Sequence, residues 1–145
     1  LIKKFRTPAL FITINPSDVC NPLVGLIQSI KIAEWWSMCA FDRAVFVARN
    51  PAAAAVFFDE IVTSFLQTIM KAGKPSLGVF GICEAYDGMV EAQGKGTLHG
   101  HFMLWLKGNP NPQMLRDRMR DDVNYKKAVI DWLEANIKCK LPGQG

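Results

Sequence analysis

The spacing of apolar residues along the chain predicts most of its secondary structure. Residues 9–15 form an apolar, partly β-branched run between prolines, which is typical of a β-strand. Residues 85–93 and 98–106 are expected to form two further strands that are joined by a glycine-rich turn. A tight hairpin places Glu91 opposite His99, so the sequence predicts antiparallel pairing.

The longest helix is predicted from Pro51 to about Lys71. Asn50 and Pro51 are typical of the N-cap and first position of a helix. Pairs of apolar residues then recur every four positions, which predicts a wide stripe that packs on a sheet. Shorter helices are expected at residues 42–49, 112–120 and 124–138. Residues 21–32 fit either a loop or a short helix that covers the sheet.

Together these elements predict an α+β fold, with a central antiparallel sheet that carries a His-x-His hairpin and with helices packed on one side. In the helix at 124–138, Val129, Leu133 and Ile137 are expected to face inward. The length fits a single domain, residues 1–145, with a real hydrophobic core. The chain begins without methionine and ends without an obvious stop signal. We therefore expect a piece of a larger protein whose C-terminal part is missing.

Composition narrows the classes of function. Half of the residues are hydrophobic and 21% are charged, which argues against disorder. The net charge of +4 permits an anionic partner such as nucleic acid but does not require one. The four cysteines lack Cys-x-x-Cys spacing, so neither a disulfide framework nor a zinc finger is expected. We also expect no signal peptide, no transmembrane segment and no membrane partner.

The only two histidines, His99 and His101, are candidate metal ligands. Alternation along a strand places both imidazoles on one face, together with Glu91 and Gln93 from the preceding strand. Two nitrogen ligands, one oxygen ligand and open positions are typical of a catalytic cation site. Glu91 is the preferred third ligand because its charge offsets that of a cation, and Gln93 is the alternative. The competing interpretation is a pair of histidines that merely packs.

Several motifs point to one family. Residues 90–101 contain the run Glu-x-Gln-Gly-Lys-Gly-x-x-His-x-His, and residues 11–16 end a strand with Phe-Ile-Thr-Ile-Asn-Pro. With the alanine-rich helix start near Pro51 and the closing segment 132–139, these motifs resemble the Helitron helicase-like N-terminal domain over nearly the whole chain. That domain is the nuclease module of rolling-circle transposases. It is similar to the HUH endonucleases, which are named for two histidines flanking a hydrophobic residue.

The resemblance implies metal-dependent nicking and rejoining of single-stranded DNA during rolling-circle transposition. It implies Mg²⁺ or Mn²⁺ as the cofactor, a tyrosine nucleophile and nuclear localisation. A helicase domain is expected in the parent protein, but this chain contains no Gly-x-x-x-x-Gly-Lys-Ser/Thr loop. Lys95, in the turn, is expected to contact DNA. Thr13 and Asn15 fit DNA contact or the floor of the site, and a plain strand end equally well.

The chain departs from the family pattern in two places. Gly100 lies between the histidines, where the family usually has a bulky residue, and we expect it to loosen the strand. The only tyrosines are Tyr86, on the face opposite Glu91, and Tyr125, at a helix start. We expect the nucleophile beyond the end of the chain, with Tyr125 as the alternative. The competing hypothesis is a degenerate transposon-derived DNA-binding domain without catalytic activity.

Overall fold

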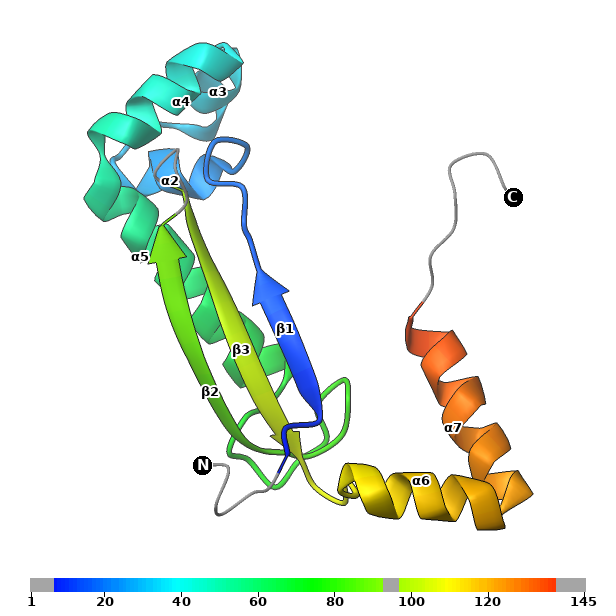
Figure 1. Cartoon of the computed structure of the whole chain (residues 1–145). Helices are drawn as coiled ribbons and strands as arrows, with labels where there is room; N and C mark the ends of the chain where they lie inside the picture. Colours follow the sequence, from blue (N-terminus) through cyan, green and yellow to red (C-terminus); the bar gives the residue numbers. More distant parts are fainter. Residues whose placement is uncertain (1–6, 93–96, 138–145) are drawn as a thin grey trace, which may run out of the picture. The chain divides into compact units, whose positions relative to one another are not determined.

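The computed structural model describes residues 7–92 and 97–137, and the chain forms two compact units, Leu1–Asn109 and Pro110–Gly145. The first unit contains helices and a sheet (Figure 1). Its elements are β1 (Leu10–Ile14), α2 (Pro22–Ile27), α3 (Ile32–Ser37), α4 (Ala40–Arg49), α5 (Pro51–Ser64), the π-helix η1 (Phe65–Ile69), β2 (Cys83–Ala92) and β3 (Leu98–Leu106).

The sheet has three antiparallel strands in the order β1-β3-β2. The central strand β3 pairs with β2 so that Glu91 lies opposite His99, which confirms the predicted hairpin register. On its other side β3 pairs with β1, and Thr13 lies opposite His101. The predicted α+β class with an antiparallel sheet is therefore confirmed. The turn of the hairpin lies outside the described residues.

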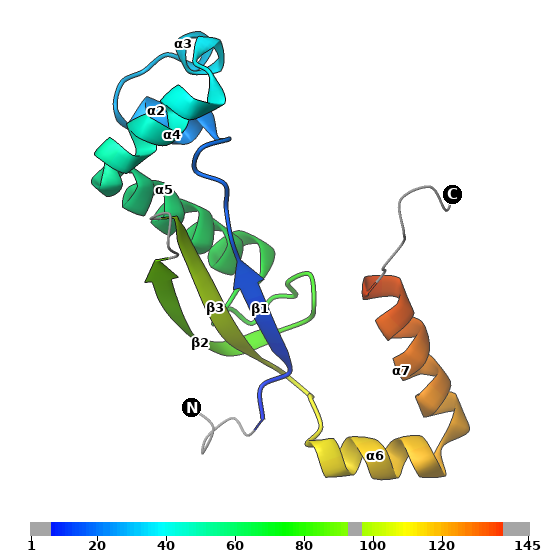
Figure 2. The same ribbon diagram turned by 45° about the horizontal axis from the view of Figure 1, so that its top comes forward.

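One face of the sheet packs on the long helix, which lies behind the strands in both views (Figures 1 and 2). Alternation directs Phe102 and Leu104 of β3 toward this face, where both are buried. The helical residues that form the core with them are Phe58, Val62, Leu66 and Met70. Leu10, Ile12 and Ile14 of β1 are partly buried against the same cluster, as their shared parity predicts. We call this side of the sheet the core face.

The long helix begins at Pro51 as predicted, but its last turn is the π-helix η1. A four-residue spacing is longer than the 3.6-residue period of an α-helix, so an apolar stripe drifts around the helix axis. The wider π turn offsets that drift and keeps Leu66 and Met70 against the sheet. By length and composition, Pro51–Ile69 could also cross a membrane. A core helix meets the same criterion, and the buried residues of this helix pack inside the unit.

A second core lies among the helices. The buried residues of this cluster are Val24, Trp35, Val47, Ala53, Ala54 and Phe57. Helix α2 begins at its N-cap Asn21, and the backbone of Gly25 lies against the indole of Trp35. A Cβ on Gly25 would be 2.7 Å from Trp35 Cε3, so only glycine permits this approach. Of the two alternatives for residues 21–32, a short helix forms, and it packs on α3 and α5.

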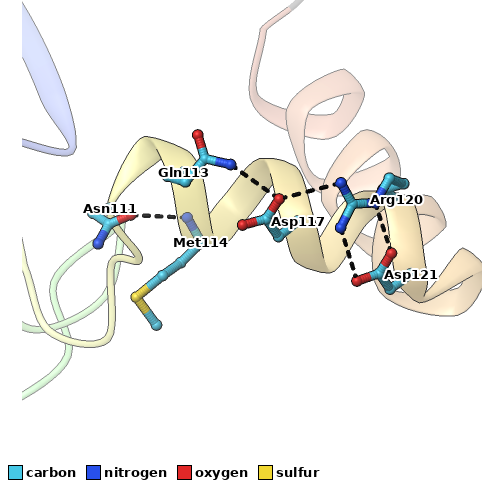
Figure 3. A network of polar contacts seen from close by, with 6 residues as sticks. All are labelled: Asn111, Gln113, Met114, Asp117, Arg120 and Asp121. Atoms are coloured by element: carbon cyan, nitrogen blue, oxygen red, sulfur yellow. Dashed lines mark hydrogen bonds and ion pairs between the residues drawn. The ribbon is translucent and has the colours of Figure 1, made fainter.

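The second unit consists of α6 (Pro112–Asp121) and α7 (Val123–Asn136). Asn111 caps α6 by accepting a hydrogen bond from the backbone of Met114, and Arg120 pairs with Asp117 and Asp121 along the same helix (Figure 3). The expectation that Leu133 and Ile137 face inward is wrong, because both are exposed. Ile137 lies beyond the end of α7, where the helical period no longer applies.

Candidate metal centre

The face of the sheet opposite the core face carries a compact cluster of three side chains. Glu91 Oε1 lies 2.7 Å from His99 Nε2 and 2.9 Å from His101 Nε2. One ligand atom from each residue lies within 4.8 Å of the other two. The cluster follows from two local rules: alternation along β3 places the imidazoles two positions apart on one face, and the hairpin register brings the carboxylate across.

Burial differs across the cluster. His99 is only 6% exposed, whereas His101 is half-buried and Glu91 is exposed. Hydrogen bonds from His101 and then from His99 hold the pKa of the Glu91 carboxyl below its ordinary value, and the smaller opposing effect of desolvation does not reverse this. The carboxylate is therefore ionised at neutral pH. An ionised carboxylate only accepts hydrogen bonds, so each ring donates from Nε2.

Strand β1 supports His101 from the other side. Thr13 Oγ1 lies 2.9 Å from His101 Nδ1, and the ring of Phe11 stacks on the imidazole with centroids 5.6 Å apart. When Nε2 of His101 is the donor, Nδ1 of the neutral ring accepts from the Thr13 hydroxyl. These two contacts fix the orientation of the imidazole plane. A partner of this kind, on the nitrogen that faces away from a ligand atom, is typical of metal-binding histidines.

His99 has a buried polar atom without a partner. Its Nδ1 has no hydrogen bond among the described residues, while its ring meets His101 edge-on with centroids 4.8 Å apart. Neighbouring ligand atoms around an octahedral cation lie about 3 Å apart, given bonds of about 2.1 Å. The two nitrogen–oxygen separations in the cluster match that spacing. The donor set of two imidazoles and one carboxylate thus suits a divalent cation, once the proton on each Nε2 moves to Nδ1 so that the nitrogen can serve as a ligand.

Gly100, between the two histidines, has a packing explanation. Its missing Cβ would be 2.6 Å from Phe102 Cε2 and 3.2 Å from Phe58 Cζ. Gly88, across the ladder, is also covered by the Phe102 ring, which would be 2.4 Å from its Cβ. Phe102 thus fills the space above two glycines on neighbouring strands. Gly100 therefore makes room for a ring in the core, which gives this glycine a packing role besides its expected effect on the strand.

The remaining candidates are placed as follows. Gln93 and Lys95 lie outside the described residues. Asn15 is exposed and follows the end of β1. Tyr86 pairs with Leu104, whose side chain is buried on the core face, so its parity is opposite to that of Glu91. Tyr125 belongs to the second unit, where the guanidinium of Arg118 lies 4.0 Å from its ring centroid.

Sequence reasoning named Thr13 as one possible residue of the site floor, but it missed Phe11 and did not identify His101 as the partner of Thr13. Phe11 and Thr13 were on one face of their strand by parity, but nothing local shows that β1 lies beside β3. The available signal was the alternation in residues 9–15, with Thr13 among apolar neighbours. That pattern identifies a strand face without identifying its partner strand.

The geometry defines an α+β domain with two histidines and a carboxylate on the open face of an antiparallel sheet. The family model for the Helitron helicase-like domain at the N-terminus matches residues 1–104. The chain therefore belongs to this family, and the matched range includes all three residues of the cluster. Comparisons with curated proteins and with solved structures give no significant match.

Proposed function

We propose that this chain nicks single-stranded DNA with the help of a divalent cation, as the nuclease part of a Helitron-type transposase with an HUH-like fold. The cluster of Glu91, His99 and His101 carries the proposal, because one ligand atom from each of the three residues lies within 4.8 Å of the other two. Membership of the Helitron family links that cluster to transposition.

Glu91 Oε1 and the Nε2 atoms of His99 and His101 would hold the cation, with Mg²⁺ or Mn²⁺ as the expected metal. Bound there, the cation would supply Lewis-acid stabilisation of charge on the scissile phosphate. Thr13 keeps His101 oriented in either tautomer, because its hydroxyl oxygen can accept a hydrogen bond as well as donate one. When Nε2 of His101 serves as a ligand, the ring proton lies on Nδ1 and Thr13 accepts it.

The proposed reaction is nucleophilic substitution at phosphorus by a tyrosine hydroxyl. The phenol loses its proton, its oxygen forms a bond to phosphorus, and the bond from phosphorus to the 3′-oxygen breaks. The leaving oxygen takes up a proton and becomes a free 3′-hydroxyl, while the 5′-phosphate remains on the tyrosine. Tyr125 is the candidate within the described residues, since Tyr86 has the parity of the core face.

The position of Tyr86 also favours a second candidate function. With no tyrosine directed toward the cluster from its own strands, the first unit supports binding of metal and DNA without cleavage. In that case the chain is a DNA-binding domain that derives from a transposon, and its cation would help to hold phosphate.

Calorimetric titration with Mn²⁺ tests the metal centre. We expect one binding site in the wild type, and a loss of affinity of tenfold or more in His99→Ala, His101→Ala and Glu91→Gln. Glu84→Gln is the matched control, because Glu84 is an exposed carboxylate on the same strand. Equal Mn²⁺ binding by the wild type and both histidine variants would show that the histidines only pack.

A cleavage assay separates the nuclease from the binding domain. If Tyr125 is the nucleophile, the wild type with a pool of end-labelled single-stranded oligonucleotides and Mn²⁺ should yield products with a free 3′-hydroxyl and a covalent adduct on the protein. Tyr125→Phe should then abolish both the products and the adduct. Binding of the pool without products or adduct would favour the non-catalytic function.

A further inference from the structure

A hollow beside the candidate metal centre is not explained by cation binding. It has a volume of about 430 Å³, which is within the range of small-molecule pockets. The hollow is open to the same face of the sheet as the cluster, and His101 belongs to both. The lining residues are Phe11, Asp87, Gly88, Met89, His101 and Met103.

The strand register explains how the hollow is built. Phe11, Met103 and Asp87 form one row across the three strands, since Met103 lies opposite both of the others. The next row along the strands contains His101 with Met89 opposite it. Successive rows on one face lie about 7 Å apart. A ligand in the hollow would therefore lie immediately beside a group held at the cluster.

The lining is suited to a flat aromatic ligand. Phe11 and Met89 are 68% and 66% exposed, although both lie within strands of the sheet. An aromatic ring and two thioethers offer stacking and sulfur–aromatic contacts, which favour a planar π-system over an aliphatic chain. Covering these side chains with a ring would bury apolar surface that is now in water.

Asp87 adds selectivity to this apolar surface. An ionised carboxylate accepts hydrogen bonds and cannot donate them, so it pairs with ligand edges that carry amino groups. Cytosine, adenine and guanine have an exocyclic amino group, whereas thymine has none. The same negative charge repels phosphate, so the base of a nucleotide would approach Asp87 in preference to its backbone.

We propose that this hollow binds one unpaired nucleobase that carries an amino group, next to the phosphate held at the metal centre. The proposal rests on the proposed function, because it assumes that the bound polymer is single-stranded DNA. It adds a base preference to that function, since a metal centre that holds phosphate carries no sequence information.

Binding of labelled 12-nucleotide homopolymers to the whole chain, measured by fluorescence anisotropy in EDTA, tests the pocket without cation chemistry. We expect the wild type to bind oligo-dC about fivefold or more tightly than oligo-dT. Asp87→Leu should remove that preference, because leucine is of similar size and cannot accept a hydrogen bond. Met89→Ala should weaken binding to both oligonucleotides about fivefold or more through lost stacking. Met114→Ala, which alters an exposed methionine of α6, is the matched control and should bind as the wild type does.

Equal affinity for oligo-dC and oligo-dT in the wild type would overturn the pocket, as would a preference that survives in Asp87→Leu. Neither result affects the metal titration or the cleavage assay. Conversely, a base preference that responds to Asp87 in a chain that binds no Mn²⁺ would support the pocket and refute the proposed metal-dependent function.

Discussion

The two faces of the central strand β3 have opposite chemistry, although they alternate along the same nine residues. Toward the helices, Gly100, Phe102 and Leu104 are buried in the core. Toward the open side, His99 and His101 meet a carboxylate. Alternate residues of one strand thus serve two purposes: one set packs in the core of the unit, and the other set forms the candidate metal centre.

This arrangement places the cluster on a strand that is held by its neighbours. His101 is paired with both β1 and β2, His99 is paired with β2, and the Phe102 ring covers Gly100 between them on the core face. Changes on the core face should therefore reduce stability, whereas changes at exposed positions of the open face should reduce binding and leave the fold intact.

Phe102→Ala should have the largest effect on stability. Removing a buried ring that covers two glycines and contacts the helix leaves a cavity, with an expected loss of about 3–5 kcal/mol in the free energy of unfolding. Urea denaturation followed by circular dichroism measures it. Phe41→Ala, at an exposed position in α4, is the control and should change stability by less than about 0.5 kcal/mol. Similar losses in the two variants would contradict the assignment of Phe102 to the core.

Gly100→Val should come next. The position has no positive φ, so the expected loss of about 1–3 kcal/mol arises from overlap with Phe102 and Phe58 and not from backbone strain. Urea denaturation of the double variant Gly100→Val/Phe102→Ala, compared with the two single variants, is a direct test. The two losses should be less than additive, because removing the ring vacates the space that the valine needs. Strict additivity would show that Gly100 and Phe102 do not compete for that space.

Thr13→Val tests whether the neighbouring strand orients His101. The substitution keeps the shape of the side chain but removes the oxygen that lies 2.9 Å from His101 Nδ1. Loss of such a supporting hydrogen bond is expected to weaken Mn²⁺ binding about tenfold while the urea midpoint changes little. Thr68→Val, at an exposed position of η1, should leave Mn²⁺ affinity unchanged. An unaltered affinity in Thr13→Val would remove Thr13 from the site.

Local rules in the sequence were sufficient for the hairpin and for some of the helix starts, but they predicted no helix at α3. The short glycine-rich connection restricts β2 and β3 to few registers, so Glu91 opposite His99 could be predicted from parity. Asn50 with Pro51 and Asn111 with Pro112 likewise mark helix starts that the structure contains. In each case the deciding contacts lie within a few residues of one another.

Contacts that join distant parts of the chain could not be predicted in this way. The hydrogen bond between Thr13 and His101 spans 88 positions, and no local pattern specifies that β1 pairs with β3. The close approach of Phe58 to Gly100 is a contact of the same kind, because the two residues are far apart in the sequence. At Leu133 the apolar period was present, but exposure depends on what packs against the helix.

The reactivity of the cysteine thiols tests whether the core face is closed to solvent. It should show the smallest effect, because no residue is substituted. Cys83 is buried in the same core cluster as Phe102, and burial raises the pKa of its thiol, whereas Cys20 and Cys39 are exposed. Alkylation requires an accessible thiolate, so both the burial and the raised pKa of Cys83 should protect it.

With iodoacetamide at pH 8, peptide mass mapping should find Cys20 and Cys39 modified first, and Cys83 modified only as urea opens the core. Raising the pH to 9 increases the fraction of thiolate. The rate of alkylation at Cys83 should nevertheless rise only in molecules whose core has opened, because the reagent cannot reach a buried thiol. Rapid labelling of Cys83 in the native chain would mean that the core face is open to solvent. That result would contradict the distinction between a buried face and an open face of the sheet.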